Sequence, residues 1–195
     1  MRDKVSKIAA FVFENGAMAQ EILFRDLEEE DEVPGLSEGE RSAMDDVAQD
    51  LLEDWVNILS ACREAVWKKA SGHPLESVLR QHRTQTRTMK DREHVEMRLD
   101  PERRATCGVS LQVWDDQDQY RVHVWVWTQA KYRDLAQDAV TGIEPAPGND
   151  GEGSLTQTVL TPKEGQLYSD IAEQAAKDLW ALARPVGEAI SKQKG

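Results

Sequence analysis

Several features that define common protein classes are scarce or missing in this 195-residue chain. There are two cysteines, Cys62 and Cys107, and neither has the CxxC or Cys/His spacing of a metal site. We therefore expect both to be buried free thiols in a reducing cytoplasm. No apolar run approaches the ~20 residues of a membrane span, so no membrane association is expected. The signatures GxxxxGK[ST], GxGxxG, HExxH and GxSxG are missing too, so the sequence favours a protein without catalytic activity or cofactor.

Basic residues are also scarce relative to acidic ones. The chain has 24 Lys and Arg against 36 Asp and Glu, a net charge of −12. Residues 1–79 carry −10 and residues 105–195 carry −5, whereas residues 80–104 carry +3. Nucleic-acid binding depends on Lys and Arg contacts to phosphates, so this balance disfavours it in general. An acidic surface fits basic protein partners better.

The first half of the chain has the 3.6-residue period of helices. We predict helices over 2–14 and 17–31, and a long amphipathic helix over about 38–70. Ser37 and Glu40 fit the N-cap and N3 positions of a capping box at the start of that long helix. At 1.5 Å per residue it would be about 50 Å long, so it spans the molecule, bends or projects. A projecting apolar stripe would need a partner, and a homodimer through this helix is one possibility.

From residue 93 the hydrophobic period changes to two, which is typical of strands. We predict strands over the ranges 93–99, 105–114, 120–128 and 155–160, and a short helix over 131–140. The Gly/Pro-rich stretch 142–154 is expected to be a loop. In a last helix, Thr161 is the expected N-cap and Pro162 the first residue, and a break or kink is expected near Pro185.

These elements indicate an α+β fold. A helical N-terminal half, residues 1–90, would pack on a three- or four-stranded, mainly antiparallel sheet with a C-terminal helix. Residues 91–195 would form the β-β-β-α-β-α segment. We expect the two segments to make one continuous domain, because 195 residues suit one domain.

The stretch YRVHVWVWTQ (120–129) gives the sharpest functional clue. A four-residue turn at 115–118 would pair Val109 with Val124, and every second pair beside them is apolar. His123, Trp125 and Trp127 then lie on the other face, which we call the Trp face. Gly108 lies opposite Trp125, an arrangement in which the aromatic ring covers a bare glycine. The preceding hairpin adds His94, Glu96 and Arg98 to the Trp face.

Three interpretations of the Trp face stay open. The tryptophans could pack under an N-terminal helix. They could instead belong to a face that binds a peptide or protein, since Trp and Arg are favoured interface residues; the candidate residues are Arg98, Gln112, Arg121, His123, Trp125 and Trp127. Thirdly, the rings could stack on single-stranded nucleic acid. Phosphate contacts would then come from a basic segment formed by Arg80, Arg83, Arg87, Lys90, Arg92, Arg103 and Arg104.

One enzyme family offers an alternative. Gln129-Ala130-Lys131 is a QxK triplet at the end of the third strand, with Asp100 and Glu102 nearby in the expected register. The helix–β–β–β–helix–β order and this triplet are similar to the core of PD-(D/E)xK nucleases. The resemblance covers about 50 residues and implies divalent-metal-dependent cleavage, with the carboxylates as metal ligands and Lys131 near the attacking water. The chain departs from the family in its Asp-Pro order and in Gln129, which replaces the usual acid.

The sequence thus favours a cytoplasmic, non-enzymatic protein-interaction protein of the adaptor, chaperone or inhibitor type. It would use an acidic helical surface and the Trp face, and it would need neither metal nor cofactor. The metal-dependent nuclease and the single-strand binder are the alternatives.

Overall fold

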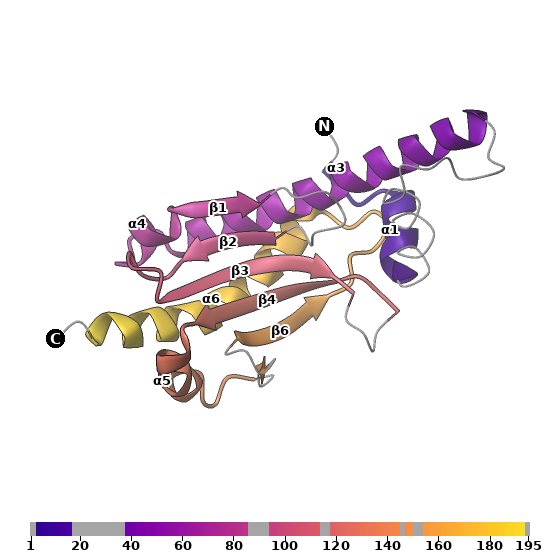
Figure 1. Ribbon diagram of the computed structural model, residues 1–195. Helices are drawn as coiled ribbons and strands as arrows, with labels where there is room; N and C mark the ends of the chain where they lie inside the picture. The colour runs from indigo at the N-terminus through magenta and orange to yellow at the C-terminus, as the bar shows by residue number, and fades with distance from the viewer. Residues whose placement is uncertain are drawn as a thin grey trace.

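The computed structural model describes residues 3–16, 38–85, 94–113, 118–144, 147–149 and 154–193 (Figure 1). The helical elements are α1 (Lys7–Glu14), α3 (Glu38–Lys69), α4 (Glu76–Leu79), η3 (Ala130–Tyr132), α5 (Arg133–Ala139) and α6 (Tyr168–Lys192). The strands are β1 (His82–Gln85), β2 (His94–Arg98), β3 (Ala105–Gln112), β4 (Arg121–Thr128), β5 (Gly148–Asn149) and β6 (Ser154–Leu160). The helix predicted over 17–31 lies outside the described residues. Ser37, the predicted N-cap of the long helix, lies outside them too.

The strands form one sheet in the order β1-β2-β3-β4-β6-β5, and every neighbouring pair is antiparallel. The predicted α+β class is therefore confirmed, with helices before the sheet and a long helix at its C-terminal end. The sheet is wider than expected because two short strands, β1 and β5, lie at its edges. The prediction missed both, since four and two residues are too short for a visible period.

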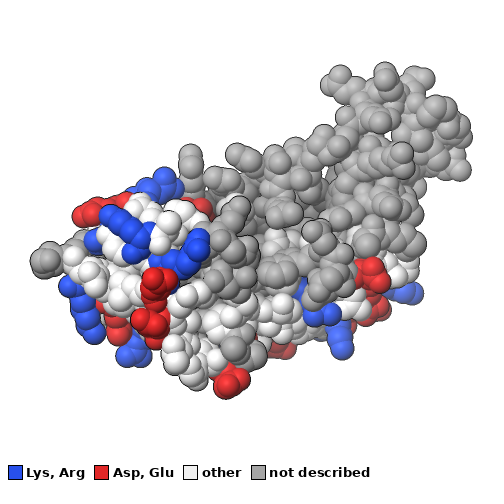
Figure 2. Space-filling view, turned by 60° about the horizontal axis from the view of Figure 1, so that its bottom comes forward, with Lys and Arg blue, Asp and Glu red and all other residues white. Residues whose placement is uncertain are grey.

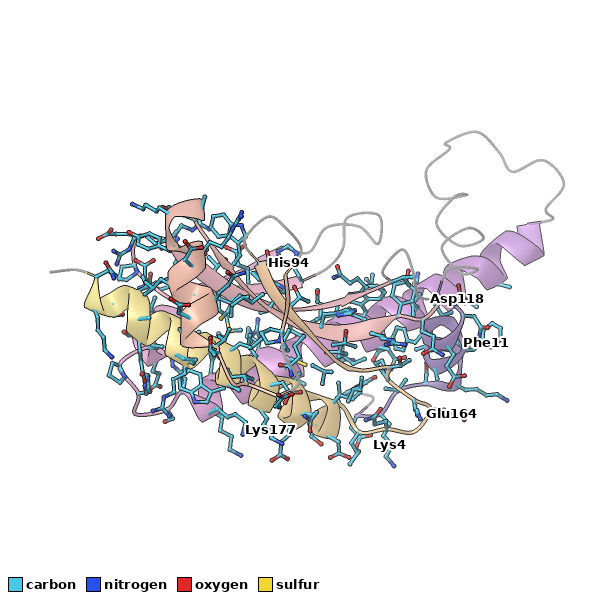
Figure 3. All side chains as sticks on the ribbon, turned by 90° about the horizontal axis from the view of Figure 1, so that it is seen from below. Lys4, Phe11, His94, Asp118, Glu164 and Lys177 are labelled. Carbon is cyan, nitrogen blue, oxygen red and sulfur yellow. The ribbon has the colours of Figure 1, made fainter. Side chains whose placement is uncertain are left out.

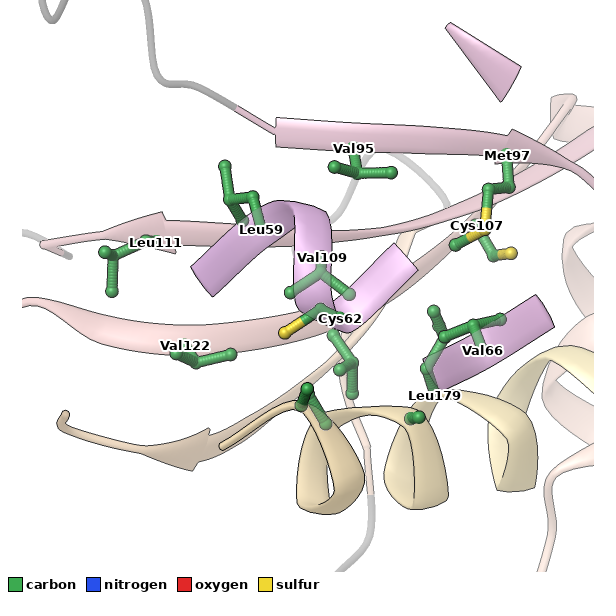
Figure 4. Close-up of a cluster of buried hydrophobic side chains, with 14 of the residues drawn as sticks. Leu59, Cys62, Val66, Val95, Met97, Cys107, Val109, Leu111, Val122 and Leu179 are labelled. Atoms are coloured by element: carbon green, nitrogen blue, oxygen red, sulfur yellow. The ribbon is translucent and has the colours of Figure 1, made fainter. Parts of the chain in front are cut away.

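The core lies between the sheet and the two long helices. Figure 4 shows β2, β3 and β4 facing α3 and α6 across side chains such as Val95, Val109, Val122 and Leu179. Cys62 and Cys107 are in this layer, both buried and free, as expected. Burial raises the pKa of the Cys62 thiol to about 12. Such a thiol stays protonated near neutral pH and behaves as a small apolar side chain.

The long helix is confirmed as α3, Glu38–Lys69. Figure 1 shows its N-terminal turns extending past the sheet, so it projects as well as packs. Large apolar side chains remain partly exposed near this end, among them Phe11 on α1, which is 58% exposed, and Leu52 and Val56 on α3. No helix among the described residues has both the length and the apolar composition needed to cross a membrane.

A buried carboxylate joins three helices at this end of the molecule. Asp54 of α3 accepts hydrogen bonds from Ser6, through its backbone N at 3.2 Å and its Oγ at 2.6 Å. The hydroxyl of Tyr168, the first residue of α6, donates to the same carboxylate. Ser6 also caps α1, because its Oγ accepts from the Ala9 amide at 3.1 Å. One fully buried charge thus fixes the relative positions of α1, α3 and α6.

Two predicted helix boundaries are wrong. The first helix begins at Lys7 and not at residue 2, because residues 3–5 pair with the chain around Leu167; the Val5 amide, for example, donates to the Gln166 carbonyl at 2.9 Å. The last helix begins at Tyr168 with Leu167 as N-cap, so Thr161 does not cap it. It does not break at Pro185 but continues to Lys192. Tertiary packing overrides the local cost of an internal proline there, since Val186 and Ile190 are fully buried.

Candidate functional site

The alternation of β4 places its side chains on opposite faces of the sheet. Val122, Val124 and Val126 are fully buried on the face that α3 and α6 cover. The predicted register is confirmed: Val109 pairs with Val124, and Gly108 with Trp125. Figure 3 shows the sheet from below, with His94 of the Trp face on one side and Lys177 of α6 on the other. The Trp face is therefore the side of the sheet away from the two long helices.

Trp125 rests directly on the sheet. A Cβ added at Gly108 would lie 2.3 Å from Trp125 Cζ2 and 2.3 Å from the carbonyl oxygen of Val95, so only glycine leaves room for the ring. The Trp125 ring also meets His94 edge-on, with centroids 5.9 Å apart and an interplanar angle of 72°. The expected covering of a bare glycine is thus confirmed. It makes Trp125 partly a structural residue.

An open hollow lies beside these rings. Its volume is about 540 Å³, and its lining comes from four strands and the β2–β3 turn: His94, Glu96, Arg103, Thr106, Trp125, Trp127 and Ser154. Both tryptophans are half-buried. Arg103 Nη2 lies 3.5 Å from Glu96 Oε1, and these are the two oppositely charged side chains of the lining. The hollow therefore combines two indoles, a carboxylate and a guanidinium, a mixture suited to a peptide side chain rather than to a purely apolar ligand.

Helix α1 packs at one end of the sheet and contributes no residue to the described lining of the hollow. Phe13 of α1 packs against Trp55 and Tyr120 instead, with ring centroids 6.3 and 6.1 Å away, at the end of the sheet where β4 begins. The Tyr120 amide donates to the Phe13 carbonyl at 2.7 Å and fixes this contact. Helix α1 therefore packs against Trp55, which does not belong to the Trp face. The second predicted N-terminal helix, over 17–31, lies outside the described residues.

His123 differs from the expectation for a binding residue. Its side chain is fully buried, and Nδ1 lies 3.2 Å from the Thr158 hydroxyl. Burial lowers the pKa of His123 to about 4; a hydrogen bond with the Gln112 backbone opposes this change, and the nearby charge of Arg121 adds to it. A neutral, buried imidazole cannot meet a partner without local opening. Its place is structural.

The other predicted binding residues are not in the described lining of the hollow. Gln112 pairs with Arg121 across β3 and β4, and both are half-buried. Arg98, also half-buried, donates from Nη1 to Gln81 Oε1 at 3.4 Å. Five of the described lining residues were not in the predicted binding set: His94, Glu96, Arg103, Thr106 and Ser154. His94 and Glu96 were placed on the Trp face but were not chosen as binding residues. Arg103 was assigned to the basic segment, and Ser154 would have been found only by pairing β6 with β4, which places it opposite Trp127.

The residues of the nuclease interpretation gather at one corner, but in structural roles. Asp100 is buried in the β2–β3 turn and accepts hydrogen bonds from the Glu102 amide at 2.9 Å and from Arg104 Nε at 3.1 Å. The amides of Arg104 and Ala105 also donate to it, at 2.5 and 3.3 Å. Burial alone would raise the pKa of Asp100, yet these hydrogen bonds together hold it below its ordinary value. Hydrogen bonds from the β2–β3 turn therefore already occupy the carboxylate oxygens of Asp100.

The rest of that corner does not converge on Asp100. Glu102 is exposed. Gln129 is joined to the turn through its backbone N–H, which donates to the Arg104 carbonyl at 3.0 Å. Lys131 Nζ lies 4.8 Å from the Tyr132 ring centroid. Within the described ranges no group of three or more His, Cys, Asp or Glu side chains could hold a metal ion.

The described side chains of the basic segment, those of Arg80, Arg103 and Arg104, all take part in ion pairs. Arg104 is buried against Asp100, and Arg80 pairs with Glu76 at 2.9 Å. The side chains of the segment's remaining members before β2, namely Arg83, Arg87, Lys90 and Arg92, lie outside the described set. Figure 2 shows basic side chains interleaved with acidic ones at the same end of the molecule. Interleaved charges of both signs favour ion pairing over phosphate binding.

Comparison with protein-family models, with curated proteins and with solved structures finds no match to this chain.

Proposed function

We propose that this chain is a non-enzymatic protein-interaction protein of the adaptor, chaperone or inhibitor type, and that it holds its partner at the hollow of the Trp face. One observation carries the proposal: Trp125 and Trp127 line an open hollow of about 540 Å³ on the side of the sheet away from α3 and α6. Trp is enriched among the residues that dominate binding energy, particularly where a pocket receives an anchor from the partner.

We propose that the protein works in the cytoplasm, because Cys62 and Cys107 are free and buried and therefore suit a reducing compartment. The acidic surface supports a partner with basic segments. The exposed acidic side chains on α3 include those of Asp46, Glu53 and Glu64. Charges of this kind raise the rate of encounter with a basic partner more than they raise final affinity.

The test selects binders without knowing the partner. A random peptide library would be selected on the wild-type protein and each enriched peptide measured against a Trp127→Ala variant. Trp127 is preferred over Trp125 because Trp125 also covers Gly108. Phe11→Ala is the matched control, since Phe11 is an exposed aromatic away from the sheet. We expect Trp127→Ala to weaken binding at least tenfold, as for an interface residue that dominates the energy, roughly 1.4 kcal/mol or more.

Two results would count against the proposal: peptides that bind Trp127→Ala as well as wild type, or peptides lost only in Phe11→Ala. Thermal melting of all three proteins must accompany the binding data. Trp127 is half-buried, so its truncation should cost less than the ~3–5 kcal/mol of a fully buried tryptophan and should leave the protein folded.

A homodimer through α3 is a separate proposal. It is supported by the projecting N-terminal turns of α3 and by the partly exposed Leu52 and Val56, one helical turn apart. Light scattering after size-exclusion chromatography should give twice the monomer mass, and Val56→Glu should return the monomer. A wild-type monomer at high micromolar concentration would refute it.

A further inference from the structure

We propose that the hollow of the Trp face recognises the guanidinium group of an arginine in a basic segment of the partner. This deepens the proposed function and rests on it. The lining supplies the two groups that a guanidinium uses best, an aromatic face and a carboxylate. Trp125 and Trp127 provide the indoles, and Glu96, whose side chain is 23% exposed, provides the carboxylate.

The chain itself places a guanidinium at this carboxylate. Arg103 Nη2 approaches Glu96 Oε1 at 3.5 Å, which is longer than a strong charge-assisted hydrogen bond. The Arg103 side chain is 44% exposed, so water competes for the pair and holds it loosely. Arg103 therefore shows that a guanidinium fits here, and it is displaceable by one presented by a partner.

The backbone of Arg103 supports a role for its side chain. Arg103 has φ +57°, the left-handed region that favours glycine, and among the described residues it is the one non-glycine residue there. The turn would accept glycine more easily, yet it carries an arginine whose side chain reaches the hollow. Arg103 thus acts as an internal occupant that competes with the partner's arginine.

The charge balance agrees with a cationic ligand. When Arg103 turns away, the described lining keeps one acidic side chain, Glu96, and no Lys or Arg. The chain as a whole carries −12. A basic segment is therefore attracted at long range by the protein and at short range by Glu96.

The experiment follows the indole N–H resonances of Trp125 and Trp127 by NMR during titration with four capped tripeptides. These peptides are Gly-Arg-Gly, Gly-Lys-Gly, Gly-norleucine-Gly and Gly-Glu-Gly. We expect the arginine peptide to shift both resonances with saturation in the millimolar range, the lysine peptide to act more weakly, and the neutral and acidic peptides to have no effect.

Three variants sharpen the test. Glu96→Gln keeps the shape and removes the charge, and should weaken the arginine peptide roughly three- to tenfold. Arg103→Gly removes the internal competitor and suits the backbone, and should strengthen binding about two- to fivefold. Arg184→Gln is the matched control, because Arg184 lies on α6, on the opposite side of the sheet from the hollow; it should leave the affinity unchanged.

The outcomes separate the two proposals. Equal shifts with norleucine and arginine would show an apolar anchor site, which overturns the guanidinium inference and leaves the protein-binding function standing. Shifts with arginine that survive Glu96→Gln unchanged would also overturn it. If no tripeptide shifts the indoles, the inference fails, and the library selection on Trp127→Ala decides the function independently.

Discussion

The burial of His123 should make the stability of this protein depend on pH in a defined window. In the folded chain the pKa of His123 is held at about 4 by burial, whereas an unfolded histidine titrates near 6.5. As pH falls from about 6.5 the unfolded state therefore binds the proton first, so unfolding becomes easier. The stability that this residue contributes is complete above pH 6.5 and is lost as pH falls to about 4.

The magnitude follows from the difference of about 2.5 pKa units, which corresponds to roughly 3 kcal/mol at about 1.4 kcal/mol per unit. Other groups act at lower pH. Asp100, whose pKa lies below its ordinary value, loses its contribution only as pH falls below about 4.

The assay is urea unfolding at constant ionic strength at half-unit steps from pH 7.5 to 4, for wild type and His123→Gln. Glutamine does not titrate. Between pH 7.5 and 4, the free energy of unfolding should therefore fall by about 3 kcal/mol more in wild type than in His123→Gln. His94→Gln is the matched control on the same face of the sheet and should keep the steep fall. Parallel curves for wild type and His123→Gln would refute the argument that a neutral imidazole is buried there.

Three further predictions concern packing and hydrogen bonds. Gly108→Ala should lower the free energy of unfolding by about 1–3 kcal/mol, because the new Cβ would lie 2.3 Å from Trp125; an unchanged urea midpoint would contradict this. Tyr168→Phe removes one hydrogen bond to Asp54 and should cost about 1–3 kcal/mol. Burial first, and Asp54 second, raise the pKa of Tyr168, so wild-type stability should decline as pH rises above about 10 and the variant should lack that decline. Asp100→Asn should destabilise the protein in urea by about 1–3 kcal/mol, and wild type should not cleave DNA with Mg²⁺ or Mn²⁺; metal-dependent cleavage that Asp100→Asn abolishes would restore the nuclease.

The sequence by itself determined the features that depend on short-range periodicity. The valines of β4 repeat every second residue, and the sequence predicts a turn at 115–118, so only one register buries an apolar pair at each position. That register also places Gly108 under Trp125, where the structure has it. The 3.6-residue period likewise gave α3 to within about one residue at its C-terminal end.

The tertiary structure alone decided which polar side chains are buried and which are accessible. His123 and Trp127 occupy equivalent alternating positions on β4, yet the first is fully buried and the second lines a hollow. Asp100 resembles a metal ligand in sequence, and only the fold of its own turn shows that four hydrogen bonds already occupy it. Ser154 reaches the hollow because β6 pairs with β4, which places it opposite Trp127, 27 positions earlier in the chain. Periodicity assigns a side chain to a face, but burial depends on chain segments distant in sequence, whose contacts no local pattern encodes.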